Sequence, residues 1–291
     1  MAHACLGVSA GGSHSSYACT MHVHALHVYP FKSARGLSPT RIAVGPLGLD
    51  GDRTFLAVHE ATGEFVSQRT HPELARVVTR LDDMHLELDL PGYPTTRLAR
   101  ASDPEARSLD VTVWDDRVVA EDAGDEVADR LSRFLGLPVR VGRFGPRTRR
   151  PVSPRYAGPE DHATFADGFP VLVTSTASLD AVTREAAALD PSLVLTMARF
   201  RPNLVVEGLD AFEEDAVVEV HAGEAVLRLV KPCARCLMID VDPETGEHAR
   251  GALKALARLR TRGSEVYFGQ NALVTRPGEV AIGDDVRVVR A

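Results

Sequence analysis

A short run near the end of the chain carries the residue types best suited to bind a soft metal. It reads Lys231-Pro-Cys-Ala-Arg-Cys236 and is followed closely by Val241-Asp-Pro-Glu-Thr-Gly246. A thiolate is a soft ligand for soft metal centres. Arg235 lies between the two cysteines, and a neighbouring guanidinium lowers the free-energy cost of deprotonating either thiol. The run is therefore predicted to present one thiolate to an electron-poor partner.

The spacing of Cys233 and Cys236 also has more familiar interpretations. A thioredoxin-like redox pair opens a helix in a βαβ unit, whereas this pair lies in a β-rich context beside proline and arginine. A zinc site needs about four ligands, and neither His221 nor His248 has zinc-finger spacing. Free cysteines are also often small buried apolar residues. The spacing alone decides neither the chemistry nor which thiol would perform it.

Basic residues on turns are candidates for binding an anion. Lys32 and Ser33 fall in the turn Tyr29-Pro-Phe-Lys-Ser-Ala-Arg-Gly36, and such turns expose backbone N–H groups. Arg53 ends the run Gly48-Leu-Asp-Gly-Asp-Arg53, where its guanidinium is suited to grip a phosphate. The alternatives are a solvated turn for the first run and an ion pair with Asp52 for the second.

Two later segments carry further polar candidates. In Phe200-Arg-Pro-Asn203, Arg201 offers five donors and Asn203 offers both donors and an acceptor. Such a pair suits a polar heterocycle or a phosphate, and a capped bulge is the alternative. Ser175 opens a predicted helix, where serine most simply serves as an N-cap. The free N–H groups at the same point also suit a phosphate.

The elements that must position these residues are mostly short strands. Alternating apolar residues separated by turn residues predict strands over 25–29, 40–44, 54–59, 77–81, 85–90 and 109–114, and further strands are predicted over 170–174 and 201–206. Residues 219–230 are predicted to form a hairpin, and residues 280–289 a final hairpin or strand pair. Helical spacing of apolar residues predicts helices over 123–137, 177–189 and 252–262. The arginine- and proline-rich stretch 143–155 is predicted to be an exposed loop or a linker between domains. Many short strands at near-regular spacing favour a mainly β, α+β protein built on barrels.

Bulk properties limit the partners and the compartment. The chain has 291 residues, 44% hydrophobic and 25% charged, with a formal net charge of −7, which argues against a general nucleic-acid binder. No apolar stretch approaches the roughly 18–20 residues that span a bilayer, so no membrane partner is expected. Residues 1–21 are small and polar and are expected to form a disordered leader. Four cysteines are too few for a disulfide scaffold, which favours a reducing cytoplasm.

The motifs taken in order resemble one family. They are Tyr-Pro-x-Lys-Ser at 29–33, Gly-Leu-x-x-Asp-Arg at 48–53, Ser67-Gln-Arg69, Phe165-Ala-Asp-Gly-Phe-Pro170, Phe200-Arg-Pro-Asn203 and the cysteine run. Over about residues 24–290 the chain resembles the MOSC-domain proteins with an N-terminal β-barrel module. That group includes the mitochondrial amidoxime-reducing component and bacterial N-hydroxylamine reductases. The resemblance implies an N-terminal module at 22–145 packed on a MOSC β-barrel with peripheral helices at 146–291.

The resemblance also implies a cofactor and residues that hold it. The family binds a molybdenum cofactor, a pyranopterin whose dithiolene sulfurs hold molybdenum. The second cysteine of the run, Cys236, would be the metal ligand and catalytic centre. The residues implied in cofactor binding are Lys32, Ser33, Arg53, Ser175, Arg201, Asn203 and Arg235.

The implied activity is the reduction of N-hydroxylated small molecules, namely hydroxylamines, amidoximes and N-hydroxy purines. The alternative is a binding protein that carries the cofactor or its sulfur, related to the C-terminal part of molybdenum-cofactor sulfurases. The chain lacks the cysteine cluster of an iron–sulfur domain and a GxGxxG fingerprint. Electrons are therefore expected from a separate ferredoxin-, flavodoxin- or cytochrome-like reductase protein.

Overall fold

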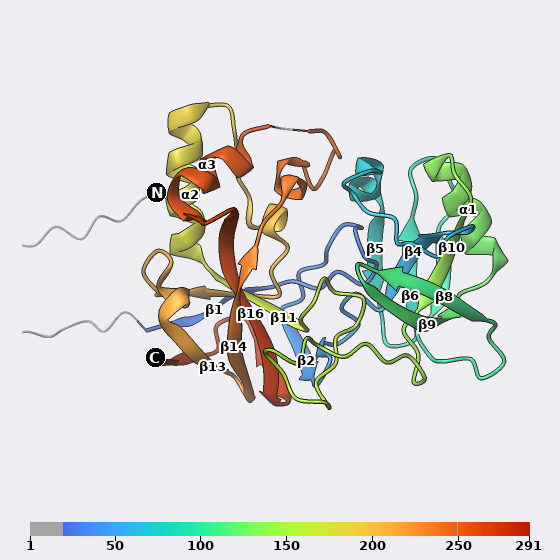
Figure 1. Ribbon diagram of the computed structural model, residues 1–291, viewed down its shortest axis with the longest axis horizontal. Coiled ribbons are helices and arrows are strands. Elements are labelled where there is room, and N and C mark those ends of the chain that lie inside the picture. The colour runs from blue at the N-terminus through green and yellow to red at the C-terminus, as the bar shows by residue number, and fades with distance from the viewer. Residues whose placement is uncertain (1–19, 249) are drawn as a thin grey trace, which may run out of the picture.

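The computed structural model describes residues 20–248 and 250–291, which form two β-rich lobes with helices at their periphery (Figure 1). The mainly β architecture predicted from the sequence is confirmed. Of the predicted leader, residues 1–19 lie outside the described residues. Met21 packs against the core of the larger lobe, and its carbonyl accepts a hydrogen bond from Val286 N at 2.8 Å. The packed chain therefore already includes the last residue assigned to the leader.

The larger lobe is a nearly closed barrel. Its sheet runs, in spatial order, through β1 (His22–Leu26), β12 (Leu204–Glu207), β11 (Val171–Ser175), β16 (Glu265–Arg276), β14 (Ala225–Ala234), β13 (Val217–Ala222) and β18 (Val286–Arg290), with β15 (Thr261–Arg262) pairing to β16. Only β11 and β12 run parallel among these pairs. The hydrogen bond from Val23 N to Asp284 O, at 2.9 Å, brings β1 beside the start of β18 and almost closes the sheet.

The smaller lobe contains two sheets and one helix. One sheet has the order β4 (Phe55–His59), β10 (Val139–Arg143), β9 (Asp116–Asp122) and β8 (Ser108–Val113); the other has the order β5 (Val78–Leu81), β6 (His85–Asp89) and β7 (Thr96–Ala99). Helix α1 (Asp125–Leu135) buries Val127, Leu131 and Leu135 against them. It ends at Gly136, whose left-handed backbone (φ 68°) favours glycine.

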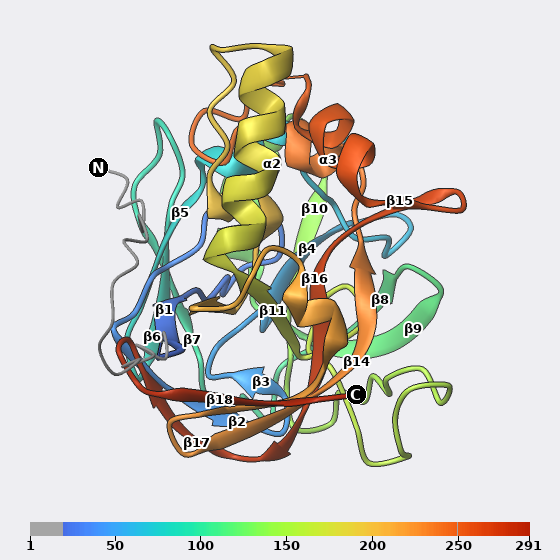
Figure 2. The same cartoon turned by 90° about the vertical axis from the view of Figure 1, so that its left-hand side faces the viewer.

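Two helices cover one side of the barrel, as Figure 2 shows. They are α2 (Thr176–Leu189) and α3 (Ala252–Arg260), and both were predicted from helical spacing. The core between them and the barrel includes Phe200 and Phe268, whose rings stack with centroids 4.0 Å apart. Short 3-10 helices lie at Pro72–Arg76, Met197–Phe200, Glu213–Ala216 and Leu237–Asp240. None of the helices in the described ranges is long and apolar enough to cross a bilayer.

The first segment of the chain contributes to both lobes. β1 belongs to the barrel sheet, and β2 (Arg41–Gly45) pairs with β17 (Gly278–Ala281) and β3 (Gly48–Leu49). Val23, Leu26 and Val44 are part of the barrel core. The domain boundary at 145/146 stays a prediction. Strands β1 and β2, which precede this boundary in the sequence, pair with β12 and β17, which follow it.

The stretch 143–155 is a loop after the end of β10, as its composition predicts, and Arg147, Arg149 and Arg155 are exposed, but two of its arginines are buried. Arg143 is buried and makes two bonds to Glu121 Oε2, at 3.0 and 2.7 Å. Arg150 is buried and donates to Thr164 O at 2.9 Å and to Asp167 O at 3.1 Å. These two arginines pack inside the fold because carboxylate and carbonyl oxygens satisfy their donors.

Candidate functional site

A pocket between the two lobes gathers most of the residues singled out in the sequence. It holds about 680 Å³ of empty space, part of which is the open solvent at its mouth. Its charged lining is Lys32, Arg53, Arg69, Arg201, Arg235 and, as the one acid among the described residues, Asp167. Five cations against one carboxylate make the pocket a site for an anion.

The turn that carries Lys32 and Ser33 enters the pocket from the strand before it. Lys32 N donates to Phe55 O at 2.7 Å, which ties the turn to β4. The ammonium of Lys32 donates to Phe165 O at 2.8 Å and to Asp167 Oδ1 at 2.6 Å. Burial lowers the pKa of Lys32 from 10.5 to about 8, although Asp167 offsets part of this effect. Burial of the Lys32 ammonium therefore costs free energy, and an anionic ligand bound beside it would reduce this cost.

Arg53 joins the two lobes at the base of the pocket. Its Nη1 donates to Asp52 Oδ2 at 2.6 Å and to Asn203 Oδ1 at 3.2 Å, and its Nη2 donates to Arg201 O at 3.1 Å. Burial acts to lower the pKa of Arg53, but the carboxylate of Asp52 more than offsets this and raises it. Arg53 therefore has the internal ion pair considered as an alternative and also lines the pocket.

Arg201 and Asn203 extend from the barrel to the base of the pocket, where Arg53 lies. Arg201 Nη1 donates to Ala34 O at 2.8 Å, and its guanidinium lies 4.1 Å from the ring centroid of Tyr29. Burial, together with the nearby Arg53, lowers the pKa of Arg201 to about 10. Asn203 Oδ1 also accepts from Leu172 N at 3.1 Å. Both side chains are held rigidly by partners from two lobes.

The two thiols of the cysteine run have different surroundings. Cys233 lines the pocket, and Arg235 Nη1 donates to its sulfur at 3.0 Å. Cys236 is contacted from the smaller lobe, where Arg69 Nη2 lies 3.3 Å from its sulfur. Both cysteines are free and partly exposed. Each thiol thus has a guanidinium beside it, Arg235 for Cys233 and Arg69 for Cys236.

The turn after the thiols is fixed against the smaller lobe. Asp242 Oδ1 accepts from the backbone N–H groups of Glu244 and Thr245 at 2.9 and 3.0 Å. Arg35 Nη2 reaches across the lobes to Glu244 O at 2.8 Å. Gly246 has φ 76°, and a Cβ there would lie 2.6 Å from Pro72 O. Only glycine permits this close approach, which anchors the cysteine run on both sides.

Ser175, which the resemblance implies in cofactor binding, does not line this pocket. Its Oγ accepts from Ser178 N at 3.1 Å as the N-cap of α2, and donates to Glu214 Oε2 at 3.1 Å. Burial raises the pKa of Glu214, although these hydroxyl groups act in the opposite direction. The buried carboxyl of Glu214 packs against the two serine hydroxyls at this helix start, and Ser175 is the N-cap of α2.

Three pocket residues were not assigned from the sequence. Arg69 lies over the ring of Trp114 at 4.2 Å, and Trp114 Nε1 donates to Asp167 Oδ1 at 3.3 Å. Arg69 and Asp167 belong to the motifs Ser67-Gln-Arg69 and Phe165–Pro170, which carried the resemblance but no role. These motifs were the features of the sequence that could have identified Arg69 and Asp167 as site residues. No such motif surrounds Trp114, which is only the last residue of a predicted strand.

Strained backbone gathers around the pocket. Five non-glycine residues of the described chain have positive φ, and four of them line this pocket: Ser33 (68°), Arg53 (47°), Trp114 (58°) and Arg201 (52°). Such conformations cost about 1–3 kcal/mol each and persist where the surrounding structure imposes them. Their clustering marks the pocket as the functional site independently of its charge.

The pocket fits the group that the resemblance implies. A molybdenum cofactor carries a phosphate and electron-rich sulfurs, and the pocket supplies five cations and the thiol of Cys233, while Cys236 lies outside the lining and contacts its residue Arg69. The Nε atom of Arg235 is buried and has no hydrogen-bond partner among the described residues. An unused buried donor is costly unless a ligand accepts from it. The positive charge, the thiols and the unpaired donor of Arg235 all suit an anionic ligand of this kind.

Comparisons with known proteins place the chain in a family. Residues 20–138 match the MOSC N-terminal beta barrel domain, and residues 160–287 match the MOSC domain. Mitochondrial amidoxime-reducing component 1 of Mus musculus is 30% identical over 91% of this chain and 81% of its own length. The human protein of that name is 29% identical over 91% of this chain and 82% of its own length. The chain belongs to the family of MOSC-domain proteins that contains these amidoxime-reducing components.

A second kind of relative shares the same region. Human molybdenum cofactor sulfurase is 26% identical over 84% of this chain, which corresponds to 29% of the sulfurase. The sequence relatives of this chain thus include proteins named for amidoxime reduction and one named as a molybdenum cofactor sulfurase.

Proposed function

We propose that the pocket binds a molybdenum cofactor and that the protein reduces N-hydroxylated compounds. The observation that carries the proposal is the pair of guanidinium-flanked thiols at the edge of a pocket lined by five cations. The names of the amidoxime-reducing relatives support the same activity. The residues proposed to hold the pterin and its phosphate are Lys32, Ser33, Arg53, Arg201 and Asn203. Cys236 is proposed as the metal ligand, with Arg235 beside it.

The bound cofactor would supply a centre able to accept an oxygen atom while it changes oxidation state. The side chains of the protein do the remaining work. Arg53 and Arg201, fixed by Asp52 and Ala34 O, present donors that are already oriented. Arg69 contacts the sulfur of Cys236, Arg235 contacts the sulfur of Cys233, and these contacts hold the two thiols in place. Trp114 and Phe65 provide apolar walls that limit water at the pocket.

The proposed overall reaction converts an N–OH group to N–H. It consumes two electrons and two protons and releases one water, so an external electron donor is required. We propose a separate donor protein, small N-hydroxylated substrates such as hydroxylamines, amidoximes and N-hydroxy purines, and no nucleic-acid partner. A cytoplasmic location also stays a prediction, since the amidoxime-reducing relatives are named as mitochondrial.

The test uses protein purified from a host that makes the cofactor. Molybdenum and pterin per chain are measured first, and turnover of an amidoxime is then measured with reduced viologen as the electron donor. Stoichiometric cofactor with turnover is expected. Chains without molybdenum from such a host would contradict the proposal.

The two cysteines form a matched pair for the ligand assignment. Cys236→Ala is expected to abolish turnover, whereas Cys233→Ala is expected to retain much of it. Molybdenum X-ray absorption of each variant reports whether a protein sulfur is still bound. Loss of turnover only in Cys233→Ala would transfer the ligand role to Cys233, which lines the pocket more directly.

A carrier for the cofactor or its sulfur is the second candidate, favoured by the sulfurase relative. It predicts stoichiometric cofactor, no turnover of any N-hydroxy compound, and transfer of the cofactor to an acceptor apoenzyme. The turnover assay therefore separates the two candidates.

A further inference from the structure

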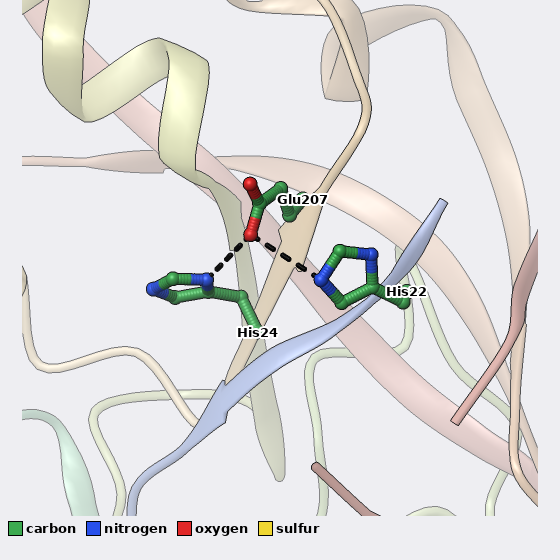
Figure 3. A group of neighbouring side chains, drawn as sticks. All are labelled: His22, His24 and Glu207. Atoms are coloured by element: carbon green, nitrogen blue, oxygen red, sulfur yellow. Dashed lines mark hydrogen bonds and ion pairs between the residues drawn. The ribbon is translucent and has the colours of Figure 1, made fainter. Parts of the chain in front are cut away.

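Three side chains far from the pocket converge on the outside of the barrel. They are His22 and His24 of β1 and Glu207 of β12, drawn in Figure 3. His24 Nδ1 lies 2.7 Å from Glu207 Oε2, and His22 Nε2 lies 3.3 Å from the same oxygen. The three atoms all lie within 4.8 Å of one another. None of these residues lines the pocket.

The strand pairing explains why the three groups meet. His22 lies directly opposite Glu207 across the antiparallel pair of β1 and β12. The register then shifts, because Val23 pairs with Val206 and Ala25 pairs with Val205. His24 is the extra residue of this bulge, and bulges redirect side chains. Val23 is fully buried, whereas the two histidines are partly exposed and share the outer face.

A second contact orients one of the rings. His22 Nδ1 lies 3.4 Å from the carbonyl oxygen of Thr20. Donation to this carbonyl leaves Nε2 as the nitrogen with a free lone pair, and Nε2 is the atom that faces Glu207. Metal-binding histidines usually donate their other N–H group to a carbonyl or carboxylate in this way.

We propose that His22, His24 and Glu207 form a surface binding site for Zn²⁺. Two imidazoles and one carboxylate suit zinc and related transition metals, whereas Ca²⁺ and Mg²⁺ prefer oxygen ligands alone. Three protein ligands leave a fourth position for water. The outer position of the site leaves it open to metal from solvent.

The site lies at the seam where the barrel closes. β1 is held by β12 on one side and by contacts with residues 283–286 on the other. Zinc bound by both β1 and β12 would cross-link them at this seam. The metal is therefore expected to stabilise the docking of the first strand and to play no part in the reaction at the pocket.

The test uses the full chain with all four cysteines, Cys5, Cys19, Cys233 and Cys236, replaced by serine, which removes the thiols as competing ligands. After dialysis against a chelator, the protein is titrated with Zn²⁺ by calorimetry and with Co²⁺ by visible absorption. Binding to the site is expected to raise the unfolding temperature and to give a cobalt spectrum whose main saturable component lacks thiolate charge-transfer bands. Absence of saturable binding would show that the three groups are only an ion pair.

Variants assign the binding to this site. His24→Ala and Glu207→Gln are each expected to lose one equivalent of bound Zn²⁺ and the thermal shift. His221→Ala is the matched control, because His221 also contacts a carboxylate, that of Glu219, but has no third ligand. It is expected to bind like the parent. Unchanged zinc binding in both triad variants, with native unfolding in metal-free buffer, would overturn the proposal.

Discussion

Lys32 is, with Arg201, one of two pocket cations whose pKa is strongly lowered by burial. Its side chain is 6% exposed, and Asp167 is its ion-pair partner. Burial lowers its pKa to about 8, so the cofactor-free protein is destabilised by this charge at neutral pH. A bound phosphate would reverse that cost. Lys32 is therefore expected to lower the stability of the cofactor-free protein and to strengthen binding of the cofactor, a balance that is common at functional sites.

The pH dependence of stability should reveal this cost. Between pH 8 and 10.5 the unfolded chain keeps a proton that folded Lys32 has already released, so this group makes the free energy of unfolding rise with pH. The rise is at most about 3 kcal/mol. Urea unfolding of cofactor-free protein from pH 7.5 to 10.5 measures it, and Lys32→Met should lack it. Parallel curves for parent and variant would contradict the lowered pKa.

Arg53 is expected to contribute directly to cofactor retention. A charge-assisted hydrogen bond is worth about 1.5–3 kcal/mol, so Arg53→Ala should weaken binding roughly 10- to 100-fold. Molybdenum and pterin per purified chain measure the loss. Arg41→Ala is the control, because Arg41 forms an exposed ion pair with Glu279 away from the pocket. Equal cofactor content in the two variants would show that Arg53 does not contribute to cofactor retention.

The sequence located most pocket residues but not their arrangement. Lys32, Arg53 and Arg201 stand in short motifs whose residue types alone suggest anion binding. For Ser175 the sequence left two interpretations open, because a helix start suits both a cap and a phosphate, and only the fold shows that it caps α2 and contacts Glu214 away from the pocket lining. Arg69 meets Cys236 across 167 positions of sequence, and no local pattern reports such a contact.

At the scale of elements, the loop of residues 164–168 positions one wall of the pocket. Arg150 Nη1 donates to Thr164 O at 2.9 Å and also bonds Ala166 O, while its Nε donates to Asp116 Oδ2 at 2.9 Å. The loop carries Asp167, the partner of Lys32. A buried arginine thus holds in place a segment with no regular secondary structure of its own.

Removal of this arginine should loosen the loop and the fold. Arg150→Met leaves at least two buried carbonyls without a donor, at roughly 1–3 kcal/mol each. The free energy of unfolding should therefore fall by about 2 kcal/mol or more, measured by urea denaturation. Arg149→Met is the neighbouring control, since Arg149 contacts only Pro146 O and Thr148 O, and should change stability by about 0.5 kcal/mol or less. Equal effects of the two substitutions would deny Arg150 this role.

Predicted elements succeeded where periodicity was clean and failed where the chain bends. Helices α1, α2 and α3 and the early strands follow their apolar patterns. β16 was missed because Gly269, with φ 76°, interrupts the alternation where the strand passes close to Thr174. The stretch 143–155 is a loop as predicted, but composition does not show that two of its arginines, Arg143 and Arg150, are buried and paired with oxygens of the fold.

At the scale of the whole molecule, the two matched domains share strands and a pocket. The barrel core takes five buried side chains from the first segment of the chain: Val23, Leu26, Val28, Val44 and Leu49. Burying each contributes about 1.5–3 kcal/mol. Their sum, about 8–15 kcal/mol, is as large as the net stability of a typical domain. The barrel is therefore not expected to fold without residues preceding position 50.

This dependence can be tested by dividing the chain at the predicted boundary. Residues 146–291 produced alone lack β1 and β2, which leaves the edge of β12 unpaired and the barrel core open. We expect aggregation or a broad, non-cooperative thermal transition by circular dichroism. Residues 20–291 serve as the control and should unfold cooperatively. A sharp transition in 146–291 alone would mean that the MOSC barrel is self-sufficient, and that its first strands matter only for positioning Lys32 and Arg53 at the shared pocket.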